Sequence, residues 1–292
     1  MNVMRKKILL FVLLLVGVIV YWAISFNPSK EITALNFESE NRNPAFQFLF
    51  PKPTEDSILR QLRQNYPIEA LVKNAKSERE KVLLALNWVR QQWEHSTSHN
   101  AKTDNACLIL ERAKKGEQFR CVEYGVVLKS VLAALGLPSR TLSLKTRDVS
   151  TTFVAAGHVL AEVWLNDYQK WAFVDAQFDA MPVLDSVPLN AVELQNAIIQ
   201  KKPFKFIHLQ GDFTVQETAN YMGFIPHYLY YMSVAFDERN VKSGDKFKVA
   251  NKTALMLVPL GAKNPNIFQL FFPMNNLLYT HSLADFYAKP LQ

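Results

Sequence analysis

Hydrophobic residues change their spacing twice along the chain, and the two changes divide it into three parts. Residues Ile8 to Phe26 are almost all apolar and carry no charge. From about residue 55 to residue 135 the apolar positions recur at helical spacing, and after Pro138 they alternate as in strands. Helices followed by antiparallel strands predict an α+β domain rather than repeated β-α-β units.

The N-terminal apolar run has the length of a membrane span. A helix over 8–26 would be roughly 28 Å long at 1.5 Å per residue, close to the ~30 Å hydrocarbon core of a bilayer. Tyr21, Trp22 and Phe26 stand at its far end, as interfacial aromatic residues do. We therefore expect an uncleaved signal-anchor helix. A cleaved signal peptide is the alternative, for which Ala23-Ile24-Ser25 makes a poor cleavage site.

Charge sets the expected topology and limits the partners. The net charge is +7, and Arg5, Lys6 and Lys7 supply three of it, which leaves +4 (7 − 3). The positive-inside rule places residues 1–7 in the cytoplasm and the chain from Asn27 onward in the periplasm or outside the cell. The remaining positive charge is scattered, whereas a nucleic-acid-binding face needs clustered basic residues. We expect membrane attachment through the N-terminal helix and no nucleic-acid partner.

Three further segments follow. Residues 27–54 contain four prolines and predict a linker or stalk. The main domain is expected over 55–200, with helices at about 55–74 (interrupted near Pro67), from the capping box Ser77-x-x-Glu80 to Trp93, at about 106–115, and from Cys121 onward. Residues 201–292 are rich in aromatic side chains and predict a β-rich extension with short strands at 246–249, 253–258 and 267–272. Core packing is the expected use of these aromatics, and a carbohydrate- or peptide-binding surface is the alternative.

Three polar side chains stand where catalysis could use them. Cys121 opens a helix, and a thiol at a helix N-terminus ionises more readily. The segments 139–145, 157–165 and 171–175 predict strands, with the last two forming a hairpin about Asn166-Asp167. That hairpin places His158 and Asp175 opposite each other, with Cβ atoms about 4.5–5.5 Å apart. A carboxylate, an imidazole and a thiol in this order form a nucleophile, its base and an orienting group.

These residues carry a resemblance to a known family. Residues 116–140, with a cysteine opening a helix that ends in Leu-Gly-Leu-Pro-Ser-Arg, resemble the cysteine segment of the transglutaminase-like superfamily. Gly157-His158-Val159-Leu160-Ala161-Glu162-Val163 and Trp171-Ala172-Phe173-Val174-Asp175 are similar to its histidine and aspartate segments. The resemblance covers about residues 75–180. It implies a papain-like α+β fold, with Cys121 as nucleophile, His158 as general base and acid, and Asp175 as orienting carboxylate.

The implied activity is thiol acyl transfer through a Cys121 thioester, by hydrolysis of a peptide or amide bond in a protein, a peptide or the cell wall. Such chemistry needs no cofactor. Hydrolysis is favoured over cross-linking because water is the default acceptor, although a fold does not fix a reaction. The alternative is a catalytically inactive binding or scaffold module of the cell envelope, built on the same fold.

The family pattern is weaker beside the cysteine. Many members have a glycine just before it and a tryptophan after it, whereas this chain has Gln118-Phe119-Arg120 and Val122. The oxyanion donors are therefore open: the Cys121 backbone N–H is one candidate, and Gln118 or a nearby tryptophan N–H is the second. Arg120 and Glu123 are candidates for the substrate cleft.

A disulfide and a metal site are the alternatives to catalysis for the cysteines and histidines of this domain. Cys107 and Cys121 could form a disulfide outside the cytoplasm, although this would consume the nucleophile. His95, His99 and Asp104 share one loop, but their spacing fixes no ligand geometry, so we expect no metal site.

Overall fold

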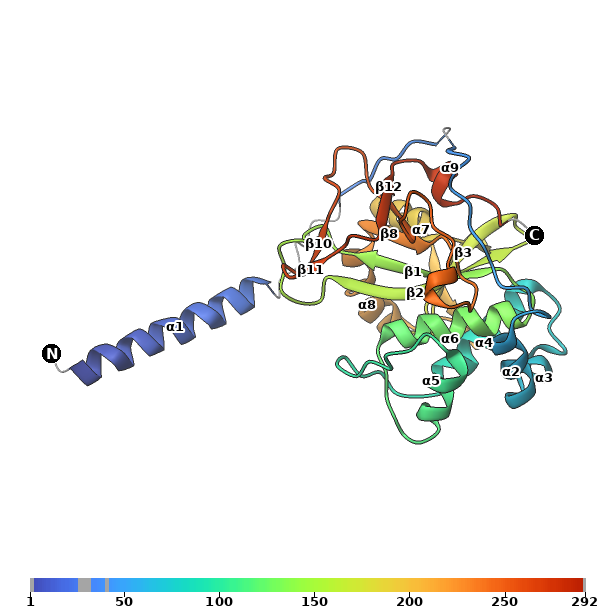
Figure 1. The fold of residues 1–292 in the computed structure, drawn as a ribbon, viewed down its shortest axis with the longest axis horizontal. Helices are drawn as coiled ribbons and strands as arrows, with labels where there is room; N and C mark the ends of the chain where they lie inside the picture. The colour runs from blue at the N-terminus through green and yellow to red at the C-terminus, as the bar shows by residue number, and fades with distance from the viewer. Residues whose placement is uncertain (1–2, 26–32, 40–41, 291–292) are drawn as a thin grey trace.

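A central six-stranded sheet separates the two layers of the molecule in this computed structural model, which describes residues 3–25, 33–39 and 42–290 (Figure 1). Neighbouring strands are antiparallel except β12 and β9, which run parallel, so the sheet is mixed. In spatial order the strands are β12 (Leu277–Thr280), β9 (Ala254–Leu257), β8 (Tyr231–Ala235), β1 (Ser139–Lys145), β2 (Gly157–Leu165) and β3 (Lys170–Val174). The predicted α+β class is confirmed.

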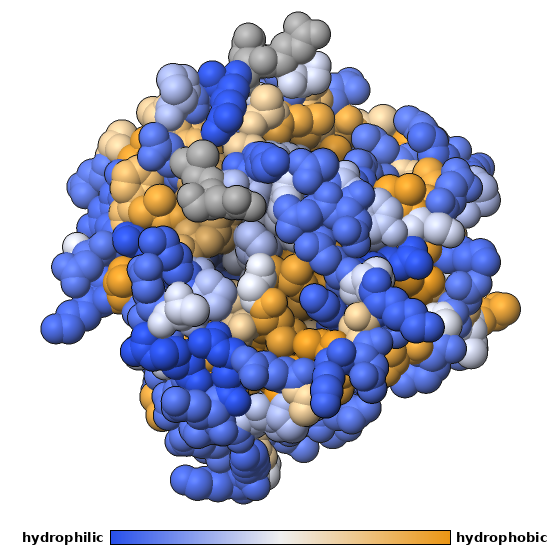
Figure 2. All heavy atoms as spheres, turned by 90° about the vertical axis from the view of Figure 1, so that its right-hand side faces the viewer, coloured by the Kyte–Doolittle hydropathy of each residue, from blue (hydrophilic) through white to orange (hydrophobic). Residues whose placement is uncertain are grey.

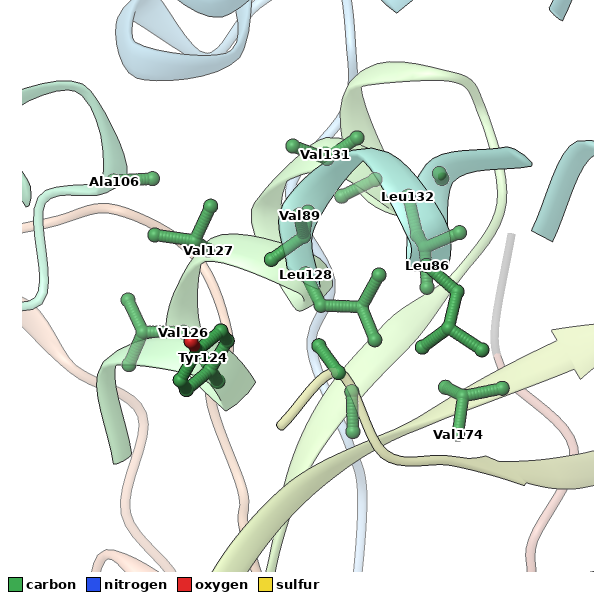
Figure 3. Packing of buried hydrophobic residues seen from close by; sticks show 14 of the residues in the cluster. Leu86, Val89, Ala106, Tyr124, Val126, Val127, Leu128, Val131, Leu132 and Val174 are labelled. Carbon is green, nitrogen blue, oxygen red and sulfur yellow. The ribbon is translucent and has the colours of Figure 1, made fainter. Parts of the chain in front are cut away.

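Five helices cover one face of this sheet. Alternate residues of β2 and β3, such as Ala161, Val163 and Val174, point into a hydrophobic core shared with these helices (Figure 3). The most buried helix, α6, lies directly on the sheet, and α4 and α5 pack against it. The helices are α2 (Ser57–Asn65), α3 (Ile68–Val72), α4 (Glu78–Arg90), α5 (Ala106–Ala113) and α6 (Cys121–Ala134).

Their boundaries follow the capping signals. The side chains of Asp56, Ser77 and Asn105 accept bonds from the first backbone N–H groups of α2, α4 and α5. Pro67 separates α2 from α3, as predicted. After α6 the chain turns at Gly136, whose φ of +83° favours glycine.

The opposite face of the sheet carries a second core. It includes Leu142, Leu160 and Phe173 from the sheet together with most aromatic residues of the C-terminal third. Around it lie α7 (Ala191–Ile199), α8 (Val215–Met222), η1 (Ile225–Tyr228), α9 (Leu283–Phe286) and a small sheet of β4 (Met181–Leu184), β5 (Val187–Pro188), β6 (Lys205–His208) and β7 (Gly211–Asp212). The aromatic side chains here serve packing.

Residues 201–292 differ in detail from the predicted extension. Their strands β8, β9 and β12 complete the central sheet, so this segment is continuous with the main domain. Residues 246–249 form no strand; η2 (Ser243–Asp245) precedes them, and Val249 makes only an isolated bridge. Residues 267–272 divide into the hairpin β10 (Ile267–Phe268) and β11 (Phe272–Pro273), because Gln269 and Leu270 turn the chain with φ of 49° and 62°.

The N-terminal part consists of one helix and an arm. The helix α1 (Val3–Ser25) extends away from the rest of the molecule, and its apolar side chains from Ile8 to Val18 are exposed (Figure 1). The predicted span 8–26 lies partly outside the described residues, at 26 and at the side chains of 19–25. Over the residues that the structure describes, no helix has the length and apolar character needed to cross a membrane.

Part of the predicted linker 27–54 is an extended arm that packs on the domain. Within 27–54, residues 27–32 and 40–41 lie outside the described residues. Phe46 and Phe48 are buried against Phe236, at ring-centroid distances of 5.9 and 5.7 Å. The described part of this segment therefore packs on the second core.

A buried ion pair joins the first two strands. Arg140 and Glu162 face each other in the β1–β2 register and are both fully buried. The Nε and one terminal nitrogen of Arg140 donate to Glu162 Oε2, at 3.0 and 2.7 Å, and its other terminal nitrogen donates to the Phe286 carbonyl at 2.8 Å. The guanidinium also lies 4.2 Å from the ring centre of Trp171. One side chain thus links β1, β2, β3 and α9.

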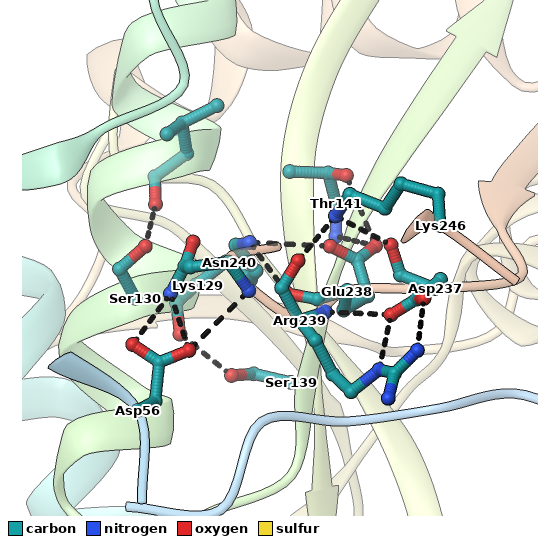
Figure 4. A network of polar contacts seen from close by, with 11 residues as sticks. Asp56, Lys129, Ser130, Ser139, Thr141, Asp237, Glu238, Arg239, Asn240 and Lys246 are labelled. Carbon is teal, nitrogen blue, oxygen red and sulfur yellow. Dashed lines mark hydrogen bonds and ion pairs between the residues drawn. The ribbon is translucent and has the colours of Figure 1, made fainter. Parts of the chain in front are cut away.

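A second polar network holds α6 to the segment after β8 (Figure 4). Lys129 of α6 pairs with Glu238 at 3.3 Å, and Glu238 accepts the backbone N–H of Thr141 on β1. Asn240 donates to Asp56, the N-cap of α2. These contacts fix the C-terminal half of α6 against both the sheet and α2.

Breaking the Arg140–Glu162 pair should strongly destabilise the fold. Arg140→Met leaves a buried carboxylate without its counter-ion, which costs about 3–5 kcal/mol in comparable cases. Replacing both partners, as Arg140→Met with Glu162→Leu, should recover most of this loss, because no charge then remains buried. Urea unfolding of both variants measures the two free energies. A loss below about 1 kcal/mol for Arg140→Met would contradict the role given to the pair.

Candidate active site

Cys121 stands at the first residue of α6, where a loop holds the helix start. Ser96 N–H donates to the carbonyl of Phe119 at 2.9 Å, and the hydroxyl of Tyr124 donates to the carbonyl of Trp93. Glu123 accepts the backbone N–H of Arg120 at 3.2 Å as a cap. These bonds fix the position of the Cys121 side chain, which is partly exposed.

A close approach between α6 and β2 sets the height of the thiol over the sheet. A Cβ added at Gly125 would lie 3.1 Å from both the Leu160 carbonyl oxygen and Val159 Cγ1. Only glycine leaves room for the helix to pack this closely. Gly125 lies one turn after Cys121, so a larger residue here would lift the thiol away from β2.

His158 and Asp175 meet by a register that differs from the predicted one. The hairpin loop spans residues 166–169 and pairs Leu165 with Lys170, so Asp175 falls beside Leu160 rather than opposite His158. The two side chains lie on the same face of the sheet as diagonal neighbours, and His158 Nε2 is 2.7 Å from Asp175 Oδ2. The side-chain hydrogen bond between His158 and Cys121 completes the series. The structure brings all three predicted residues together.

Tyr221 is a further member that the sequence did not single out. Its hydroxyl, on α8, donates to Asp175 Oδ2 at 2.7 Å, and its ring is buried. Burial and the Asp175 carboxylate raise the pKa of Tyr221 well above its usual value, so it remains a donor. In the sequence it is one of many aromatic residues in the C-terminal third, and nothing there distinguishes it.

The charge distribution favours a protonated histidine. Burial is the largest influence on His158 and lowers its pKa, but the Asp175 carboxylate and the bond to Cys121 outweigh it and raise the pKa to about 10. The imidazole can therefore hold a proton beside the sulfur throughout the neutral range. His95 also lies close, since burial and then the charge of His158 lower its pKa.

Aromatic rings enclose the histidine. Phe224 and Tyr228 lie with ring centres 5.1 and 5.9 Å from His158, and Phe178 lies at 6.1 Å. His158 is only 1% exposed as a result. Burial first, and the charge of Cys121 second, raise the pKa of Tyr228, so its hydroxyl stays neutral. This enclosure strengthens the His158–Asp175 bond by excluding water.

The oxyanion candidates occupy different environments. Gln118 is exposed, whereas Trp93 is 6% exposed and its Nε1–H is buried without a partner among the described residues. The Cys121 N–H, at a helix start, has no backbone acceptor among the described residues. Within this set the Trp93 N–H is a buried donor without a partner among the described residues, whereas Gln118 is exposed.

Arg120 and Glu123 have mainly structural surroundings. Glu123 is 1% exposed and accepts the Ala101 N–H at 3.0 Å as well as that of Arg120. It ties the preceding loop to the helix and does not line a cleft. Arg120 is partly exposed, lies 3.5 Å from Glu123 Oε1, and stays beside Cys121 as the N-cap residue.

The cysteines and histidines considered for a disulfide or a metal site lie as follows in the structure. Cys107 and Cys121 are both free thiols, and burial, with Glu111 and Asp56, raises the pKa of Cys107 to about 11. His99 lies 2.8 Å from Glu117. No group of three potential metal ligands gathers in the part of the chain that the structure describes.

The chain was compared with curated proteins and with solved structures. No curated protein matches the chain. Among solved structures, a proposed cysteine protease from Cytophaga hutchinsonii is 18% identical with a TM-score of 0.34, over 49% of this chain and 46% of that chain. A proposed protease from Parabacteroides distasonis is 14% identical (TM-score 0.32, 56% and 28%), and a TGase is 21% identical (0.28, 42% and 31%). These likenesses are too distant to carry an argument about activity.

A family model also matches part of the chain. The family model of the transglutaminase-like superfamily, Transglut_core, matches residues 68–176, the segment that contains Cys121, His158 and Asp175. Over this segment, which is less than half of the chain, the protein is similar to the transglutaminase-like superfamily.

Proposed function

We propose that this protein is a thiol acyl-transfer enzyme that hydrolyses a peptide or amide bond. The observation that carries the proposal is the hydrogen-bonded series from Cys121 through His158 to Asp175. A nucleophile, a base and an orienting carboxylate in contact are the parts that covalent acyl transfer needs.

In the first half-reaction, the Cys121 thiolate attacks the amide carbonyl carbon and a C–S bond forms. The carbonyl electron pair moves onto oxygen, where the Cys121 N–H and the indole N–H of Trp93 can donate to it. His158 then gives its proton to the amide nitrogen as the C–N bond breaks. The amine leaves, and the acyl group remains as a thioester.

In the second half-reaction, His158 takes a proton from water as the water oxygen attacks the thioester. The C–S bond breaks, the acid leaves, and the thiolate is restored beside the imidazolium. Tyr221 and Asp175 hold the imidazole in place during both transfers. A peptide, a protein or a cell-wall amide fits this chemistry as substrate.

We also propose that the protein acts outside the cytoplasm, held to the membrane by its N-terminal helix. The support is the uncharged apolar run from Ile8 to Phe26 and the three basic residues before it. The periplasmic or extracellular side is then the place of the reaction.

Cys121→Ala should abolish cleavage of a peptide amide while leaving the fold intact, because it removes the nucleophile. The reactivity of the wild-type thiol is measured separately, by alkylation with iodoacetamide near pH 7 followed by mass spectrometry. Wild-type Cys121 should react at least about 10-fold faster than a free cysteine, because a thiol beside a histidine that an aspartate orients is an activated nucleophile. Cys107→Ala is the matched control and should leave the rate unchanged. If Cys121 reacts no faster than a free thiol and no peptide amide is cleaved, the chain is an inactive binding module.

Asp175→Asn should shift the pH dependence of the reaction. The carboxylate raises the pKa of His158, so the imidazolium persists as pH rises and is lost near pH 10. Without that charge, burial still lowers the pKa, and the alkaline fall of kcat/KM should move at least about one pH unit lower. Asp179→Asn, in the same turn but bonded to Asn87, is the control. Unchanged profiles for both variants would rule out this role for Asp175.

Deleting residues 1–26 should release the protein from the membrane. The full chain should sediment with membranes after a carbonate wash, and the shortened chain should stay in the supernatant with Cys121 still reactive. A membrane-impermeant maleimide should label Cys121 in intact cells if this part of the chain is extracytoplasmic. Recovery of the full chain in the soluble fraction would refute the anchor.

A further inference from the structure

A buried lysine lies in a pocket beside the candidate active site. Lys145, the last residue of β1, is 7% exposed. Its Nζ donates to the hydroxyls of Ser143 at 2.9 Å and Ser233 at 3.0 Å. No carboxylate of the described residues pairs with it. Burial alone lowers the pKa of Lys145, to about 8, so near neutral pH most of the lysine is still charged.

This arrangement differs from the other buried cations. Lys129 pairs with Glu238, and Arg140 pairs with Glu162. A buried ammonium without a counter-ion is unfavourable, and the fold keeps it between two neutral hydroxyls. An ammonium has three donors, and the two serines occupy two of them. The third is available to an anion.

The pocket around Lys145 has room for a ligand. Its volume is about 430 Å³, and it lies between the first turns of α6 and the strands β1, β8 and β9. Ser143, Ser233 and Asn276 are polar, and the walls are apolar, formed by side chains such as Val122, Val126 and Phe268. One cation with hydroxyl and amide groups in an apolar cavity suits a single negative charge carried on an apolar body. A phosphate dianion would call for more positive charge.

The pocket adjoins the reacting residues. Val122, which lines it, follows Cys121 directly in the chain. Leu144 pairs with His158 and Lys145 with Gly157 in the β1–β2 register, so the lysine lies at the same end of the sheet as the histidine, with its side chain on the opposite face, toward α6. A ligand held by Lys145 would extend along the N-terminal turn of α6 toward the sulfur.

We propose that the Lys145 pocket binds a carboxylate carried by the acyl part of the substrate, and so selects acidic acyl groups for transfer to Cys121. This rests on the proposed function for its catalytic meaning, although binding of the carboxylate is independent of it. Lys145 here determines specificity and takes no part in the bond changes.

The test compares matched thiol probes that differ only in one charge. The probes are N-chloroacetyl derivatives of glycine, β-alanine, 4-aminobutanoate and 6-aminohexanoate, each with its primary amide. Cys121 displaces chloride and forms a C–S bond, and mass spectrometry gives the rate. At one chain length the carboxylate should react at least about 10-fold faster than the amide, the value of a charge-assisted hydrogen bond. In Lys145→Met this ratio should fall to about one.

The variants separate selection from folding. Lys145→Met should keep or raise the melting temperature, because it removes an unpaired buried charge, and Lys145→Arg should keep the preference for a carboxylate. Lys129→Met is the matched control, since it changes a buried lysine that lies outside the pocket; the ratio should stay at its wild-type value. A lower melting temperature in Lys145→Met without any change in the ratio would overturn the proposal.

Direct binding gives a readout that needs no reactive thiol. In Cys121→Ala, pentanoate should raise the melting temperature, pentanamide should not, and Lys145→Met should remove the shift. A shift with inorganic phosphate but not pentanoate would refute the carboxylate assignment. If iodoacetamide alkylation shows an unreactive Cys121 and pentanoate still binds through Lys145, the proposed function fails and the site remains. A reactive Cys121 with no charge preference and no pentanoate shift would overturn the pocket and leave the proposed function in place.

Discussion

The fold depends on the pairing of Arg140 with Glu162 inside a ring of aromatic side chains. The two residues face each other across β1 and β2, so their ion pair opposes any slip of register between these strands. A one-residue slip would turn every side chain of the strand to the other face of the sheet. His158 stands on the same strand four residues before Glu162, and its distance to Asp175 is set by the β2–β3 register. The Arg140 guanidinium also lies over the Trp171 ring of β3, so the buried pair supports both strands that carry the histidine and the aspartate.

The secondary structure of the main domain could be predicted because local signals agree with the fold. Caps at Asp56, Ser77 and Asn105 and the turn at Gly136 mark helix ends, and β1 and β2 have the predicted bounds. The hairpin register could not be obtained this way. A four-residue loop displaces the pairing by two positions from that of a two-residue turn, and the contacts that select it come from elements distant in the chain.

In the candidate site, too, local motifs predict some residues and long-range packing places the others. Cys121, His158 and Asp175 stand at element ends with recognisable motifs, so sequence reasoning could group them. Tyr221 lies 46 residues beyond Asp175 on a helix that the aromatic pattern did not resolve. Lys145 reads in the sequence as an ordinary strand lysine, and only the packing of β8 against β1 buries it. Long-range packing of this kind leaves no local signal.

The last part of the chain bears on when the protein can fold. The Phe286 carbonyl accepts from Arg140, and the Ala288 carbonyl accepts from the Trp171 indole at 3.0 Å. During synthesis or export, β1, β2 and β3 emerge more than a hundred residues before these acceptors do. The buried guanidinium gains its Phe286 acceptor only after that residue has been made. Until then the pairing of β1 with β2 surrounds a charge that lacks one of its acceptors, so these strands reach their full stability late in folding.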